Sequence, residues 1–413
     1  MLIKTRFKPA TAFRPFSSSL MSEKKSLNSI HSQCFRIQRQ QATHSNQPFH
    51  QQTRSASTTT SWIGSKMLTL PNMESSTHGQ NQQARLANYP DDIQHVVSMV
   101  QSYDPVSTLP GFLLPTNTLK LSYFTIRSFW VETGLRKQMT SSYSNSNSPS
   151  STSFVAPAEQ HLNWWQDGID TIYAANQETS NEESINHPTL RLINYLVNVE
   201  KLPLSKVHFD TIIQARKLDL DTQQYSTVDD LIHHVGTMSC GSLFSLLLEA
   251  AESGLQVDTS SDKIVYNFGV GHGITNSLRL SIPIISSTGK LIIPEDLCLK
   301  HDIKSPRYLL SALGQGDLQC KLNLQNAVEE LTKTARTHIQ QGKESLEACY
   351  EDCNDEKLLT EKQIFLPILA SETFLDRLQS VDYDLTNRSL RNVSWMEHAQ
   401  CAWKMISNSM SSK

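Results

Sequence analysis

The sequence predicts an all-α protein, and three observations lead to this fold class. Apolar side chains recur three and four residues apart over long stretches between residues 91 and 407, which is the spacing of a buried helix face. The alternating patterns that are typical of strands are sparse. Prolines, acidic residues and glycines stand at many of the positions where helices begin and end.

The expected helices follow one another along the chain. A proline and two acids at residues 90–92 predict a helix start, and the apolar residues of 93–100 continue it at helical spacing. The clearest helix is expected over 228–252, where Thr227 and Asp230 can form a capping box. Residues 109–115 are expected to be a broken apolar segment, and further helices are predicted over 119–137, 158–175, 187–199, 205–218, 262–282, 306–313, 323–345, 364–379 and 396–407.

The N-terminal stretch differs from the rest of the chain in charge. Residues 1–60 hold nine Lys or Arg against one acid, Glu23, and are rich in Ser, Thr and Gln. This composition predicts a mitochondrial transit peptide, and the alternative is a plain disordered tail. A secretory signal is not expected, because no apolar core of the necessary length is present. Residues 61–90 are expected to be a disordered, low-complexity linker.

The remaining chain, residues 91–413, is expected to form one helical domain. Loop insertions are predicted at 138–157, which is rich in Ser and Asn, and at 346–360, which is acidic. The formal net charge of −3 excludes a polycationic protein and gives no reason to expect a nucleic-acid partner. No run of about 18 uncharged apolar residues occurs, so a membrane-spanning helix is not expected. Seven scattered cysteines favour a reducing compartment.

Glycines at 269, 271 and 273 lie close together in an apolar segment. They do not match the dinucleotide fingerprint G-x-G-x-x-G, because position 274 is Ile and the segment continues a helix. We interpret Gly269, Gly271 and Gly273 as positions where a neighbouring backbone approaches closely.

Neither a metal ion nor another cofactor is expected. His233 and His234 with Cys240 could suggest a metal site, but adjacent histidines point about 100° apart on a helix and cannot easily bind one ion. Neither C-x-x-C nor H-E-x-x-H occurs, and the nucleophile pattern G-x-S-x-G is also absent. His272 is interpreted as a helix histidine whose hydrogen bonds are satisfied within the protein.

A set of segments, in order, resembles the squalene/phytoene synthase superfamily between about residues 93 and 405. The resemblance is strongest to its mitochondrial branch, the NADH dehydrogenase (ubiquinone) complex I assembly factor 6 proteins. Among the motifs are an F-x-x-R-x-F-x-x-E pattern that ends at Glu132 and an N-x-x-R pattern at Asn276 and Arg279. The matching segments are 103–105, 111–115, 124–132, 162–169, 187–188, 202–203, 213–219, 241–243, 269–279, 293–298 and 381–384.

The resemblance implies a prenyl-synthase-like helical domain around a central cavity. Active members hold Mg²⁺ with two Asp-rich helix segments that bind the diphosphate of the substrate. Here the first region keeps one carboxylate, Glu132, and in the second Arg279 is followed by Leu280 rather than an acid. The resemblance therefore implies a pseudoenzyme without catalytic residues, in which Arg127, Glu132, Asn276 and Arg279 are vestigial pocket positions.

Two roles remain open for Glu132. It could be a buried ion-pair partner of Arg127 or Arg279, or it could keep a ligand-binding role. Trp164 and Trp165 are interpreted as core and groove packing, with a substrate wall as the alternative.

The implied function is a non-catalytic assembly factor for mitochondrial respiratory complex I. The resemblance places it on the matrix side of the inner membrane, in peripheral contact with that membrane. Its partners would be complex I subunits or an early membrane-arm intermediate, held in an apolar groove. One alternative is an active squalene/phytoene synthase-type prenyltransferase that uses Mg²⁺ and prenyl diphosphates. Another is a lipid-binding scaffold that has no connection with complex I.

Overall fold

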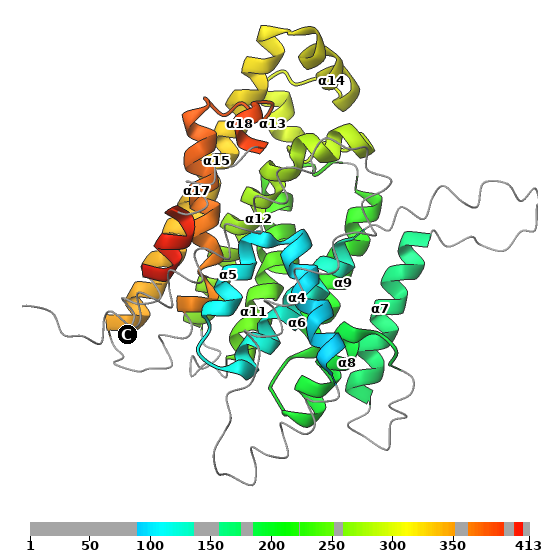
Figure 1. The fold of residues 1–413 in the computed structure, drawn as a ribbon. Helices are drawn as coiled ribbons and strands as arrows, with labels where there is room; N and C mark the ends of the chain where they lie inside the picture. Colours follow the sequence, from blue (N-terminus) through cyan, green and yellow to red (C-terminus); the bar gives the residue numbers. More distant parts are fainter. Residues whose placement is uncertain are drawn as a thin grey trace, which may run out of the picture. The chain divides into compact units, whose positions relative to one another are not determined.

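The computed structural model describes residues 89–135, 157–174, 185–222, 224–251, 259–351, 362–391 and 400–407. These residues all lie in the unit that spans Gly64–Lys413. The regular elements among them are helices, with no strand, so the predicted fold class is confirmed (Figure 1). The predicted transit peptide, most of the predicted linker and residues 136–156 lie outside the described residues.

The first three helices of the described residues place α6 in the interior. They are α4 (Pro90–Tyr103), α5 (Pro105–Leu113) and α6 (Asn117–Gly134). The Thr116 hydroxyl caps α6 by accepting a hydrogen bond from the Leu119 amide at 3.2 Å. Most of α6 is buried, because α4, α8, α9 and α11 pack around it. A helix covered on so many sides belongs to the core of a bundle.

The next helices flank α6. They are α7 (Pro157–Ala174), α8 (Pro188–Asn194), the π-helical turn η3 (Tyr195–Val199) and α9 (Lys206–Asp221). Helix α8 contacts both α4 and α6. Its start lies beside the end of α6, because Thr189 near the start of α8 donates a hydrogen bond to Glu132 near the end of α6.

The helix predicted over 228–252 is present, but a π-helical turn interrupts it. It consists of α10 (Val228–His233), the π-helical turn η4 (His234–Ser239) and α11 (Cys240–Ala250). The predicted capping box is confirmed: the Thr227 hydroxyl accepts from the Asp230 amide at 3.1 Å, and the Asp230 carboxylate accepts from the Thr227 amide at 3.0 Å.

This stretch, Val228–Ala250, is long and apolar enough to cross a membrane. However, 72% of its most apolar window is buried inside the protein, and Leu243, Phe244 and Leu246 are fully buried. A core helix of a helical bundle has the same character, so composition alone is weak evidence for a membrane span.

The C-terminal helices complete the described fold. They are α12 (Thr259–Thr288), α13 (Glu295–Lys300), α14 (Pro306–Gln315), α15 (Leu318–Glu351), α17 (Pro367–Ser380) and α18 (Arg388–Arg391), and residues 400–407 are also helical. The long helices α12 and α15 pack side by side (Figure 1).

The glycines of α12 allow this packing. A Cβ atom on Gly271 would lie 2.4 Å from Cγ1 of Ile339 and 3.1 Å from the carbonyl oxygen of Ala335, both on α15. A Cβ atom on Gly273 would lie 2.4 Å from Cβ of Val235. A Cβ atom on Gly269 would lie 2.8 Å from the carbonyl oxygen of Gly236. The predicted close approach of a neighbouring backbone is therefore confirmed at Gly269 and Gly271, whereas Gly273 faces the side chain of Val235 on η4.

Two sequence predictions were wrong. Within the segment 109–115, which was predicted to be broken, residues 109–113 belong to the continuous helix α5, even though Pro110 lies inside it, and the helix ends at Leu113. The acidic linker predicted from residue 346 is helical as far as Glu351, as part of α15. Leu346 is partly buried against the core, so tertiary packing there outweighs the polar composition.

Candidate functional site

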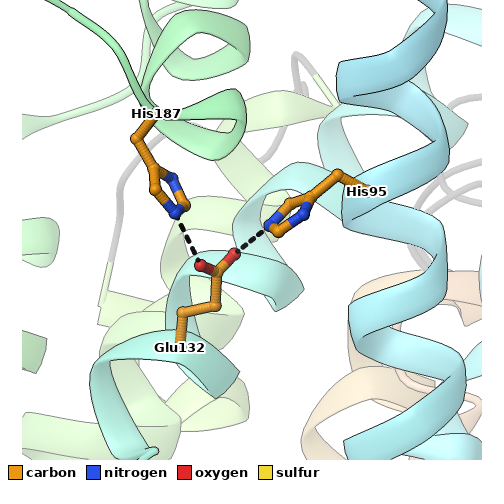
Figure 2. A group of neighbouring side chains, drawn as sticks. All are labelled: His95, Glu132 and His187. Atoms are coloured by element: carbon orange, nitrogen blue, oxygen red, sulfur yellow. Dashed lines mark hydrogen bonds and ion pairs between the residues drawn. The ribbon is translucent and has the colours of Figure 1, made fainter. Parts of the chain in front are cut away.

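Glu132 lies near the end of α6 between two histidines from other elements. Its Oε1 atom is 3.2 Å from Nε2 of His95 on α4, and its Oε2 atom is 3.1 Å from Nε2 of His187, the residue before α8. Figure 2 shows the two imidazole rings pointing at the carboxylate from opposite sides. Each imidazole therefore contacts a different oxygen of the Glu132 carboxylate.

Two hydroxyl groups complete the surroundings of this carboxylate. Ser128, one turn earlier on α6, donates to Oε1 at 2.7 Å, and Thr189 on α8 donates to the same atom at 2.5 Å. Burial alone would raise the pKa of Glu132, but the hydrogen bonds from His187, His95, Thr189 and Ser128 outweigh it and hold that pKa well below its usual value. Glu132 is therefore ionised at neutral pH.

The cluster opens toward solvent on the histidine side. The side chain of Glu132 is 9% exposed, whereas those of His95 and His187 are 32% and 24% exposed. The rings of Trp164 and Trp165 lie 5.5 and 5.0 Å from the ring of His187. Trp165 is buried, which confirms its predicted place in the core, but Trp164 is 45% exposed and forms the outer edge of the cluster.

Neither arginine predicted as a partner of Glu132 takes that role. Arg127 is fully buried and donates from Nη1 to Oδ2 of Asp104 at 3.0 Å. Its guanidinium carbon lies 5.4 Å from the ring centroid of Tyr123, within cation–π range. Since residues on one helix point in different directions, Arg127 and Glu132 on α6 meet different neighbours.

Asn276 and Arg279 contact each other on α12. Arg279 donates from Nη1 to Oδ1 of Asn276 at 2.9 Å, and its guanidinium carbon lies 4.8 Å from the ring centroid of Phe374. Nδ2 of Asn276 is 3.0 Å from Nε2 of His272, whose Nδ1 is 2.9 Å from the Ser371 hydroxyl. The prediction that His272 is a satisfied helix histidine is therefore confirmed. Burial, with the nearby positive charges, lowers the pKa of His272 well below 6.5.

A pocket of about 180 Å³ lies between α6, α9, η4 and α12. Of the four predicted pocket positions, Asn276 alone is among the residues that line it. The one carboxylate in this lining is Asp219, which lies 3.0 Å from Nε2 of His234 and accepts a hydrogen bond from the Tyr225 hydroxyl at 3.1 Å. Arg127, Glu132 and Arg279 are not among the residues that line this pocket.

Sequence reasoning missed the two histidines that face Glu132. The ligand atoms of His95, Glu132 and His187 lie within 4.8 Å of one another, so this group could hold a metal ion. The three residues come from three separate elements, and no spacing motif connects them. His187 lies in the segment 187–188, which resembles the squalene/phytoene synthase superfamily, and this resemblance is the one signal that could have drawn attention to it.

Comparison with known families supports the fold. The family model for squalene/phytoene synthase matches residues 148–397. Two solved structures share the fold. One is the squalene synthase HpnC from Alicyclobacillus acidocaldarius, with a TM-score of 0.52 at 13% sequence identity. The match covers 72% of this chain and 97% of the HpnC chain. The other is a dehydrosqualene synthase in complex with ligand, with a TM-score of 0.57 at 16% sequence identity. That match covers 79% of this chain and 99% of the synthase chain.

Several curated relatives are named as complex I assembly factors rather than as synthases. A Drosophila melanogaster protein named "NADH dehydrogenase (ubiquinone) complex I, assembly factor 6 homolog" is 25% identical over 316 residues, which are 76% of this chain and 84% of the relative. The assembly factor 6 proteins of Bos taurus and Homo sapiens are 23% and 22% identical, and each alignment covers 72% of this chain and 77% of the relative.

Proposed function

This chain belongs to the squalene/phytoene synthase family, and we propose that it uses the family's helical fold as a non-catalytic assembly factor for mitochondrial respiratory complex I. The similarity to relatives named as complex I assembly factors extends over about three quarters of the chain and supports this role. Because the similarity is spread over most of the fold, the proposal does not depend on any single motif.

The pocket beside Asn276 is the observation that supports a non-catalytic role most directly. A magnesium–diphosphate site needs several carboxylate oxygens directed at one cavity. Asp219 is the one carboxylate in this pocket, and Arg216, His234 and Tyr225 already surround it. The pocket of about 180 Å³ is also smaller than the roughly 300–1,000 Å³ that holds a drug-sized ligand.

The first family region supports the same conclusion. Glu132 is the remaining carboxylate there, and both of its oxygens face hydrogen-bond donors. In the second region, Leu280 and Ser281 follow Arg279, at positions where the resemblance implies metal-binding aspartates in active members. Residues 124–135 hold one acid, Glu132, and residues 276–281 hold none, which supports the proposal that this chain lacks a pair of carboxylates for a diphosphate-bound Mg²⁺.

We further propose that the protein acts on the matrix side of the inner membrane. The basic, acid-poor composition of residues 1–60 supports import as a transit peptide. The helix Val228–Ala250 is already engaged in the core, which supports a peripheral rather than an integral attachment. The partner would be a complex I subunit or an early membrane-arm intermediate.

Loss of the protein tests the proposed function. Cells that lack it should show reduced NADH:ubiquinone oxidoreductase activity, with less mature complex I and more partial assemblies on native gels. Re-expression of the full chain should restore assembly, whereas a chain without residues 1–60 should not. Normal complex I in cells without the protein would contradict the proposal.

An assay of prenyl transfer tests the enzymatic alternative. Purified protein with Mg²⁺ and farnesyl or geranylgeranyl diphosphate should release no pyrophosphate above background, while an active squalene synthase in a parallel reaction should. Turnover that is lost in a Glu132→Ala variant would show that the protein is an enzyme.

A further inference from the structure

We propose that His95, Glu132 and His187 form a binding site for a divalent transition-metal ion, with Zn²⁺ as the ion that fits best. One ligand atom from each of the three residues lies within 4.8 Å of the other two (Figure 2). This proposal does not depend on the role in complex I assembly, because it rests on the geometry of the three side chains.

The chemistry of the three ligands selects the ion. Two imidazole nitrogens and one carboxylate oxygen form a set that binds Zn²⁺ and related transition metals, whereas Mg²⁺ and Ca²⁺ prefer oxygen ligands alone. Three protein ligands also leave a coordination position open for water or another small ligand. The site is therefore different in kind from the magnesium-binding carboxylates of active family members.

The present contacts show how an ion would be held. Each histidine directs Nε2 at the carboxylate, at 3.2 Å for His95 and 3.1 Å for His187. An ion between these atoms would replace the shared protons and sit about 2.0–2.2 Å from each ligand. Both histidines are partly exposed, so an ion can reach them and small movements of their side chains can close the coordination sphere.

The surrounding residues hold the carboxylate in place. The hydroxyls of Ser128 and Thr189 both donate to Oε1 of Glu132, whereas Oε2 contacts Nε2 of His187, which is itself a proposed ligand. Such supporting hydrogen bonds orient metal ligands in known sites. The rings of Trp164 and Trp165 pack against His187 and restrict how its ring can turn.

Titration of the full-length protein tests the proposal. After treatment with a chelator, the protein should bind one Zn²⁺ per chain by calorimetry, and excess Mg²⁺ should not compete. The variants His95→Gln and His187→Gln keep a hydrogen-bond donor near Glu132 but remove an imidazole ligand. Each should weaken Zn²⁺ binding by more than about 100-fold, which exceeds the usual effect of removing a supporting residue.

Two further variants separate the metal site from general effects. Ser128→Ala removes one supporting hydrogen bond and should weaken binding by about 10–100-fold. His233→Gln changes an exposed histidine on α10 and should leave Zn²⁺ affinity unchanged. The melting temperature of each metal-free variant shows whether the fold survives the substitution.

Cobalt provides a check that does not depend on any variant. Co²⁺ bound by nitrogen and oxygen ligands has visible d–d bands but no thiolate charge-transfer band. Such a charge-transfer band would place the ion on a cysteine and overturn the proposal. Absence of saturable Zn²⁺ binding, or unchanged affinity in both His95→Gln and His187→Gln, would overturn it as well. Complex I assembly in cells could remain normal in either case, so this test and the test of the proposed function can fail separately.

Discussion

Asp104 accepts a hydrogen bond at 3.0 Å from the fully buried guanidinium of Arg127. Asp104 lies between α4 and α5, whereas Arg127 lies in the middle of α6, so this ion pair ties α4, α5 and α6 together. The side chain of Asp104 is 13% exposed, and water therefore screens the pair only weakly.

Removal of the carboxylate should destabilise the fold. Asp104→Ala leaves the buried charge of Arg127 without its partner, which typically costs about 3–5 kcal/mol. The exposed pair Arg336–Asp376 provides a control, since Asp376→Ala should cost at most about 1 kcal/mol. Urea unfolding of both variants measures the difference, and equal losses would contradict the structural role of Asp104.

A side chain at Gly271 should destabilise the contact between α12 and α15. In Gly271→Leu, Cβ would come within 2.4 Å of Ile339, and overpacking of this kind typically costs about 1–3 kcal/mol. Gly314→Leu is a matched control, because a Cβ atom at Gly314 meets nothing within 4 Å. We expect a lower melting temperature and less protein in cells for Gly271→Leu alone. Wild-type stability in that variant would refute the close-approach argument.

The stability that Glu132 contributes should decrease in acid. Its pKa in the folded protein is lowered below 4.5, so the contribution is complete above the unfolded-state pKa and is lost as pH falls toward the folded-state value. The free energy of unfolding of the wild type should therefore fall more steeply than that of Glu132→Gln below about pH 4.5, by at most about 1.4 kcal/mol per pH unit. Urea unfolding at several pH values measures this difference, and parallel curves would count against the hydrogen-bonded carboxylate.

Residues 1–60 should direct import into mitochondria. A soluble reporter fused to this segment should be found in mitochondria, because the segment is basic and acid-poor. Replacement of Lys4, Arg6, Lys8 and Arg14 by Gln should reduce import. Fluorescence microscopy and fractionation measure the result, and a cytosolic reporter from the unmodified fusion would disprove the prediction.

Much of the fold could be predicted from local features of the chain. The capping box of Thr227 and Asp230 joins residues three apart, and the periodic apolar residues that follow act over one or two helical turns. The role of Gly271 could also be recognised locally, since a glycine within a long apolar helix indicates a close contact. The all-α fold and most helices follow from such short-range patterns.

The sequence by itself determined the fold class and the single carboxylate of the first family region, whereas the tertiary structure decided what that carboxylate meets. Glu132 pairs with His95 and His187 rather than with Arg127 or Arg279, because the packing of α4 and α8 against α6 sets its neighbours. His95, His187 and Thr189 come from elements that are distant from Glu132 in sequence, and no spacing along the chain encodes these contacts. Ser128, one turn earlier on α6, is the local partner.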